Sequence, residues 1–141
     1  MNFEIVSHEA LGPIHFGMSR DEVQRSVGAA VKLFRKTPVG NLVDAFNEEG
    51  IHVYYDAEDK DKCEAIEVAS PANPLLLGRG LVGRPFAEVL EWLRTLDADL
   101  AVDESGLTSL ALGVGVFAPF AAKAPFEPVE AVIAFKRGYY K

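Results

Sequence analysis

Cysteine is almost missing from this chain of 141 residues, which contains Cys63 alone. A single cysteine excludes an internal disulfide framework and is typical of a reducing compartment. The sequence also lacks an apolar run of the roughly 20 residues that a membrane-spanning helix requires. Its first stretch, "MNFEIVSHEA", has neither a basic region nor a hydrophobic segment, so no signal peptide is expected. These absences predict a soluble cytoplasmic protein without a membrane partner.

Sequence motifs for catalysis or ligand binding are lacking as well. The three histidines, His8, His15 and His52, show no metal-ligand spacing such as i, i+4. No G-x-S-x-G, phosphate-binding loop or dinucleotide fingerprint occurs. The stretch "DAEDKDK" lacks the glycine and the terminal glutamate of a calcium-binding EF-hand loop. We therefore predict no catalytic residues, no metal and no cofactor, and a protein that is not an enzyme.

Positive charge is scarce, and the formal net charge is −7. Nucleic-acid binding needs a basic surface, so we expect no nucleic-acid partner. The 24 residues from Asp44 to Glu67 hold nine acids against Lys60 and Lys62, which gives −7, so the other 117 residues sum to zero. This segment is either a solvated hairpin or a face that meets a basic partner. The candidate partner-binding residues of the second interpretation are Asp44, Glu48, Glu49, His52, Tyr54, Asp56, Glu58 and Asp59.

A partial internal repeat is present at a shift of 66 residues. "LGPIHFGMSRDEV" from Leu11 falls on "LGRGLVGRPFAEV" from Leu77, and the identical positions are 11/77, 12/78, 17/83, 22/88 and 23/89. Each copy predicts a short turn or strand that leads into a glycine, then one helix, then two or three strands. We therefore expect two related units, 1–70 and 76–141, joined by a proline-containing connector at 69–78.

Two amphipathic helices are predicted. In the first, Ser19 and Glu22 have the spacing of a capping box, Met18 and Val23 fit a hydrophobic staple, and Gly28 can end the helix. "GPIHFGMSRDEV" is thus interpreted as a helix start rather than as a catalytic motif. The second helix begins near Pro85, and its apolar stripe comprises Phe86, Val89, Leu90, Leu93 and Leu96. Trp92 lies off that stripe.

Strands are predicted at 31–36, 41–47, 50–56, 63–69, 106–114 and 129–136, with a turn at Pro38–Gly40. In 50–56, alternation places Ile51, Val53 and Tyr55 on one face and His52, Tyr54 and Asp56 on the other. The same alternation makes Cys63 a half-buried strand residue rather than a nucleophile. Short loops between successive strands favour antiparallel pairing. The expected fold class is α+β, with two similar helix-plus-antiparallel-sheet units in one compact domain.

"FGMSRDEVQRSVG" resembles the phrase G-M-[ST]-x-x-E-V-x-x-x-[LV]-G that opens several small bacterial α+β domains, among them the SmpA/BamE-type lipoproteins. The chain lacks their lipoprotein signal and lipidated cysteine. The tandem plan is similar to that of the β-lactamase inhibitor protein, which grips an enzyme with its sheet but is secreted and disulfide-bonded. "GPIHFGMSRDEV", "GIHVYYD" and "AIEV" also resemble the small acidic immunity proteins encoded beside bacterial toxins. That last resemblance implies a non-enzymatic inhibitor.

Two functions therefore stand side by side. The first is an immunity-type protein that binds a toxin domain, expected to be basic, through the acidic segment. Tyrosines next to that segment, Tyr54 and Tyr55, would anchor the interface. The alternative is a small-ligand-binding or enzymatic domain with a pocket between the two units.

Overall fold

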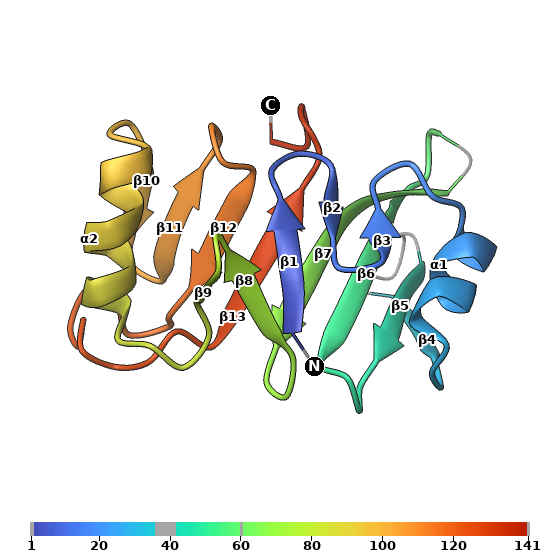
Figure 1. Cartoon of the computed structure of the whole chain (residues 1–141), viewed down its shortest axis with the longest axis horizontal. Coiled ribbons are helices and arrows are strands. Elements are labelled where there is room, and N and C mark those ends of the chain that lie inside the picture. The colour runs from blue at the N-terminus through green and yellow to red at the C-terminus, as the bar shows by residue number, and fades with distance from the viewer. Residues whose placement is uncertain (1, 36–41, 60, 141) are drawn as a thin grey trace.

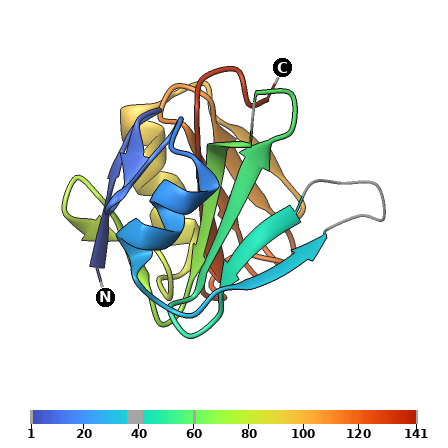
Figure 2. The ribbon, with the colours of Figure 1, turned by 90° about the vertical axis from the view of Figure 1, so that its right-hand side faces the viewer.

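The computed structural model describes residues 2–35, 42–59 and 61–140. Across these residues the chain forms two β-sheets and two α-helices, a mixed α+β arrangement (Figure 1). The smaller sheet and both helices lie on one face of the larger sheet (Figure 2). The expected turn at Pro38–Gly40 and the ends of two expected strands, Lys36 and Asn41, fall outside the described residues.

The larger sheet has eight strands in the order β10–β11–β12–β13–β7–β6–β5–β4, and every neighbouring pair is antiparallel. Four strands come from each half of the chain, and β7 and β13 pair in the middle. The strands of the first half are β4 (Lys32–Arg35), β5 (Leu42–Phe46), β6 (Ile51–Asp56) and β7 (Lys62–Ala69). Those of the second half are β10 (Ala101–Asp103), β11 (Gly106–Ser109), β12 (Val114–Phe117) and β13 (Ala131–Phe135).

The smaller sheet has the strand order β3–β2–β1–β8–β9. Its strands are β1 (Asn2–Val6), β2 (Ala10–Leu11), β3 (Ile14–His15), β8 (Asn73–Leu76) and β9 (Arg79–Gly80). β1 pairs with β8 in parallel, so the expectation that all strands pair antiparallel is wrong for this pair. The segment 69–78, expected to be a connector, contributes β8 to the sheet. β1 thereby ties the first half of the chain to the second.

The first helix, α1 (Arg20–Val27), starts and ends as the sequence predicts. The Ser19 hydroxyl accepts a hydrogen bond from the Glu22 N–H at 3.2 Å, and the Ser19 N–H donates to Glu22 Oε1 at 3.1 Å. Hydrogen bonding to the carboxyl from the Ser19 N–H, and after it from the Ser19 hydroxyl, lowers the pKa of Glu22 below its ordinary value. Gly28 ends the helix with a φ of 66°, a left-handed conformation that glycine adopts at little cost. The capping box is therefore confirmed.

Replacing Ser19 with alanine should remove one bond of this box. We expect Ser19→Ala to lower the free energy of unfolding by about 1 kcal/mol, because one N–H of the first turn loses its acceptor. Chemical denaturation of the variant against the wild type measures this loss. Ser26→Ala, an exposed change within the same helix, is the control and should change stability by less than about 0.5 kcal/mol.

The second helix, α2 (Phe86–Leu96), follows Pro85 at the N-cap position. Phe86, Val89 and Leu93 are buried as the apolar stripe predicts, whereas Leu96 is exposed. Trp92 lies beside β9, where the Arg79 guanidinium stands 4.7 Å from the centre of the indole ring. None of the helices in the described part of the chain has the length and apolar character needed to cross a membrane.

The core lies between the two sheets and beneath both helices. Ile51, Val53 and Tyr55 of β6 point into it, and the adjacent Ile66 and Val68 of β7 do the same, as the alternation predicts. The expected single strand over 106–114 is instead two strands with a turn at 110–113 between them. Gly113 has a φ of 68°, which turns the chain before β12.

Two pairs of backbone contacts recur at the starts of the helices. The Gly17 N–H donates to the Cys63 carbonyl at 2.8 Å, and the Cys63 N–H donates to the Met18 carbonyl at 2.8 Å. In the second half, the Gly83 N–H donates to the Val129 carbonyl at 2.9 Å, and the Val129 N–H donates to the Arg84 carbonyl at 2.8 Å. Every residue of the second pair stands 66 positions after its counterpart in the first. Each contact fixes the start of a helix to a strand of the larger sheet or to the segment just before one.

Candidate protein-binding face

The face of the larger sheet that points away from the helices and the smaller sheet is here called the outer face (Figure 2). Strand register places one row of side chains across all eight strands. From β10 to β4 this row comprises Ala101, Thr108, Gly115, Ile133, Glu67, His52, Ala45 and Lys32. Among the described residues no helix or strand lies over this face. It is a broad sheet surface built from both halves of the chain.

Glu67 of β7 stands at the middle of the outer face. Its side chain is 37% exposed, and Oε1 lies 3.7 Å from His52 Nδ1, close enough for an ion pair when the imidazole is protonated. The Tyr54 hydroxyl donates to the same oxygen at 3.4 Å. Burial, and after it the Glu67 charge, raises the pKa of Tyr54. Tyr54 therefore keeps its proton and remains a donor at physiological pH.

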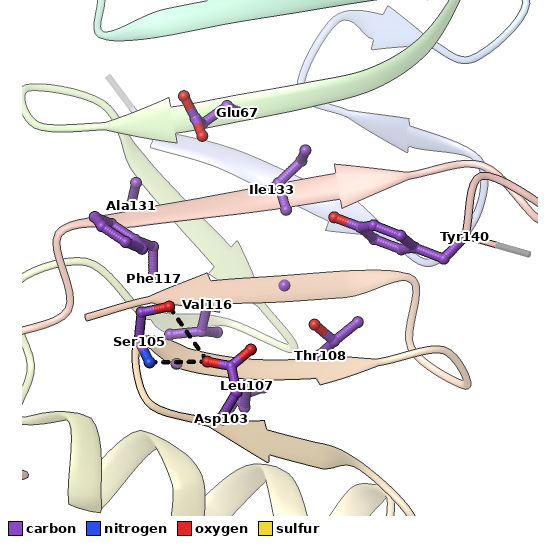
Figure 3. Close-up of a pocket in the computed structure, with 12 residues that line it drawn as sticks. Glu67, Asp103, Ser105, Leu107, Thr108, Val116, Phe117, Ala131, Ile133 and Tyr140 are labelled. Atoms are coloured by element: carbon purple, nitrogen blue, oxygen red, sulfur yellow. Dashed lines mark hydrogen bonds between the residues drawn. The ribbon is translucent and has the colours of Figure 1, made fainter. Parts of the chain in front are cut away.

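A hollow of about 170 Å³ opens beside Glu67 over β10 to β13 (Figure 3). Gly106 and Gly115 line it, and at Gly115 the absence of a side chain leaves space beside Ile133. The rings of Phe117 and Tyr140, 45% and 47% exposed, lie at its opposite ends. The remaining residues that line it are Glu67, Asp103, Ser105, Leu107, Thr108, Val116, Ala131 and Ile133.

Tyr140 is held at the hollow by an aromatic cluster. Its ring centre lies 4.9 Å from that of Phe135 and 4.9 Å from that of Tyr139, both in edge-on arrangements. Tyr139 in turn stacks on Phe135 at 5.7 Å. Burial raises the pKa of Tyr139 to about 12. Tyr139 and Tyr140 are thus packed against β13 through their ring contacts with Phe135.

Three of the expected partner-binding residues, His52, Tyr54 and Asp56, lie together on the outer face, as the alternation in β6 predicts. Asp56 Oδ2 accepts a hydrogen bond from Lys136 Nζ at 3.1 Å, and Oδ1 accepts one from the Glu58 N–H at 2.9 Å. Both bonds lower the pKa of the Asp56 carboxyl, the Glu58 N–H most strongly. Asp56 therefore stays ionised, and the ammonium group of Lys136 offsets part of its charge.

The other acidic residues that were expected to bind a partner do not form one surface patch with His52, Tyr54 and Asp56. Glu48 and Glu49 lie in the turn before β6, whereas Glu58 and Asp59 lie in the turn after it. A strand of this length separates its ends by roughly 20 Å. The acidic residues of the segment are therefore divided between two turns at opposite ends of β6.

Asp44 requires a correction, because it lies in the core and not on a binding surface. Its exposed fraction is 0%. Oδ1 pairs with Arg20 of α1, and Oδ2 accepts hydrogen bonds from Gln24 Nε2 at 3.1 Å and from the Tyr55 hydroxyl at 2.8 Å. The Arg20 guanidinium also covers the Tyr55 ring at 4.2 Å and donates to the Leu42 carbonyl at 3.1 Å. This network fastens α1 to the sheet.

Cys63 lies on the opposite side of the sheet from His52. It is 1% exposed and points into the core, and burial raises the pKa of its thiol to about 12. His8 Nε2 lies 2.8 Å from the Leu110 carbonyl, and His15 is exposed. No group of three histidine, cysteine or acidic side chains within 2–35, 42–59 and 61–140 is placed to hold a metal ion.

A second, larger depression of about 620 Å³ lies between α2, β10 and the segment 121–125. Apolar side chains of Phe86, Leu90 and Val102 line it, with Arg94 at its rim. All of its lining residues belong to the second half of the chain. This depression is therefore not the pocket that was expected between the two units.

Comparison with known proteins gives no relative: no family model matches the chain, and no curated protein or solved structure matches it either.

Several residues of the hollow escaped the sequence analysis. Thr108 falls in the stretch 106–114, which was expected to be one continuous strand, and Gly115 and Phe117 come after the end of that expected strand, so no side-chain direction was predicted for them. Once the turn at 110–113 is placed, period-two alternation puts all three on the outer face. The sequence pattern did not indicate the turn at 110–113, and without it the outward-facing residues of β11 and β12 could not be identified.

Proposed function

We propose that this chain is a non-enzymatic, cytoplasmic protein-binding inhibitor of the immunity type, which neutralises a toxin domain by covering it with the outer face. The observation that carries this proposal is an open eight-stranded sheet with exposed Phe117 and Tyr140 around a hollow. Exposed aromatic side chains that flank a depression are what protein interfaces use as anchors. The outer face replaces the acidic segment 44–59 as the expected binding surface.

We further propose that the two halves are copies of one unit. Three features support this: the 66-residue sequence match, the paired backbone contacts at the helix starts, and the strand order, which reads the same from either edge to the β7–β13 pair. In the register of that pair, Glu67 lies opposite Ile133, and these two residues are themselves 66 apart. Joining two small sheets in this way gives an interface wider than either copy has alone.

The plan also resembles that of the β-lactamase inhibitor protein, whose sheet grips an enzyme. A tandem of helix-plus-sheet units with one open sheet face fits the same use. The resemblance concerns architecture, and it supports a protein partner without naming one.

The charge of the outer face favours a basic partner. Among the described residues that line the hollow, Glu67 and Asp103 are acidic and none is a lysine or an arginine. Opposite charge on the two surfaces speeds association and disfavours wrong partners. Because the net charge of the whole chain is −7, long-range attraction acts in the same direction.

Capture of a partner by matched variants tests this function. Phe117→Ala should raise the Kd of the partner by at least about tenfold, because an aromatic anchor at the centre of an interface contributes 1–2 kcal/mol or more. Phe126→Ala makes the same change at an 82% exposed ring near the start of α2, away from the outer face, and should leave the Kd unchanged. Binding is measured by calorimetry with the protein captured from lysate of the native organism.

The captured protein must also lose its own activity when one equivalent of this chain is added. If Phe117→Ala binds as tightly as wild type and Phe126→Ala does not, the outer face is not the interface. If the partner keeps full activity in the complex, the inhibitor role is wrong.

The large depression beside α2 supports a second candidate function, binding of a small apolar ligand. Its volume of about 620 Å³ falls in the range typical of ligand sites, roughly 300–1,000 Å³. A fragment screen by NMR tests this: shifts confined to Leu90, Val102 and Ala121 would favour a ligand site, and no saturable hit would remove this candidate.

A further inference from the structure

We propose that the hollow on the outer face receives an arginine side chain of the protein partner. This inference rests on the proposed function, because it names the chemistry by which the same face would recognise its partner. It is argued from the size, the walls and the charge of the hollow.

The size of the hollow favours an inserted side chain over a free ligand. At about 170 Å³ it lies below the roughly 300–1,000 Å³ of typical small-molecule sites, yet it is several times larger than a single water requires. Gly115 keeps it open. A Cβ atom added at Gly115 would lie 2.8 Å from Ile133 Cγ2, so even a methyl group there would crowd the floor.

The walls of the hollow suit a planar cation. Phe117 and Tyr140 present half-exposed rings from opposite ends, and both are positioned by the fold, Phe117 by β12 and Tyr140 by the cluster with Phe135. Aromatic faces attract guanidinium groups more often than ammonium groups, and a flat guanidinium can stack on a ring. An arginine therefore fits these walls better than a lysine.

The charged side chains that line the hollow, within the part of the chain that the structure describes, are both acidic. Glu67 stands on one side and Asp103 on the other, while the uncharged Thr108 lies between them (Figure 3). Asp103 is held in place because its Oδ1 accepts hydrogen bonds from the Ser105 N–H at 2.8 Å and the Ser105 hydroxyl at 3.3 Å. A guanidinium in the hollow gains a charge-assisted hydrogen bond from whichever carboxylate it reaches, and the other carboxylate adds a longer-range attraction; a neutral side chain of the same shape gains neither.

An NMR titration with a small probe tests this site without the partner. The probe is Nα-acetyl-arginine methylamide, and its control is the citrulline analogue, which has nearly the same shape but no charge. At low salt the arginine probe should shift the amide signals of Thr108, Gly115 and Phe117 saturably, with millimolar affinity. The citrulline analogue should not.

A double variant, Glu67→Gln with Asp103→Asn, keeps the shape of both side chains and removes both charges. It should weaken the arginine probe about threefold to fivefold, as expected for the loss of one partly exposed charge pair and one longer-range attraction. Glu127→Gln, an exposed carboxyl near the start of α2, is the matched control and should leave the titration unchanged. Equal shifts with the citrulline analogue, no saturable shift, or no effect of the double variant would each overturn the arginine site.

Failure of this inference differs from failure of the proposed function. If Phe117→Ala abolishes partner binding but the arginine probe does not bind the hollow, the face is the interface and the arginine site is wrong. If the partner binds Phe117→Ala normally, the proposed interface is wrong whatever the probe does.

Discussion

Asp44→Leu should lower the free energy of unfolding by about 3 kcal/mol or more, because it leaves the Arg20 charge without its partner in a largely buried site. Asp44 is fully buried, and the Arg20 side chain is only 20% exposed. The substitution also removes the acceptor of the Tyr55 hydroxyl and of the Gln24 amide. Chemical denaturation followed by circular dichroism measures the loss.

In the second half of the chain, the residues at the corresponding strand and helix positions carry no charge. By strand register, Asp44 pairs with Val53 as Leu107 pairs with Val116, and Arg20 and Phe86 are the first residues of their helices. Leu107 and Phe86 are both buried. One half therefore joins its helix to the sheet with a polar network, and the other half uses apolar contacts.

This comparison supplies a rescue experiment. The triple variant Arg20→Met, Asp44→Leu and Tyr55→Phe removes the unpartnered groups together and should recover most of the stability lost in Asp44→Leu, since apolar replacement of a buried ion pair is often neutral. Glu88→Ala breaks the exposed pair with Arg84, whose atoms lie 2.9 Å apart, and should cost less than about 1 kcal/mol. If Asp44→Leu is as mild as Glu88→Ala, or the triple variant is as unstable as the single one, the network does not act as described.

Local signals in the sequence predicted the parts of the fold that local physics decides. The capping box at Ser19 and Glu22 forms because the side chain that satisfies each N–H lies three residues away. The two faces of β6 follow from alternation alone. In both cases the controlling contacts lie within a few residues of one another.

Contacts between distant segments were the ones that the sequence did not reveal. The parallel pairing of β1 with β8 joins Phe3 to Pro74, and no local pattern indicates it. Asp44 was taken as a surface residue because it is charged, although it shares a strand face with the buried Phe46. That shared face was the available signal, but its meaning depends on Arg20 being near, which only the tertiary structure shows.

The single acidic surface expected over 44–59 does not form, for a related reason. Charge density along the chain drew attention to 44–59, yet a hairpin sends consecutive turns to opposite ends of a strand. The hollow instead combines Glu67 of the first half with Gly115 and Phe117 of the second. Only the pairing of β7 with β13 brings those residues together.

The native thiol of Cys63 should react with iodoacetamide at least about a thousandfold more slowly than an ordinary cysteine at pH 8. Burial raises its pKa from an ordinary value of 9.0 to about 12, so the reactive thiolate is about a thousand times scarcer, and the 1% exposure blocks the reagent as well. Mass spectrometry of the alkylated protein measures the rate. The same protein in urea, where the pKa returns to its ordinary range, should react at the normal rate.

The reactivity of the Cys63 thiol also reports on the inner side of the sheet and not on the outer face. Because the folded state holds the Cys63 proton more tightly than the unfolded state, stability should be intact below pH 9 and should fall as the pH rises from about 9 to 12. Alkylation requires the layers above Cys63 to open, so Asp44→Leu should accelerate it by destabilising the fold, whereas Phe117→Ala on the outer face should not. Fast alkylation of the native wild type would mean that the core around Cys63 is open to solvent, which would contradict the 1% exposure of this residue.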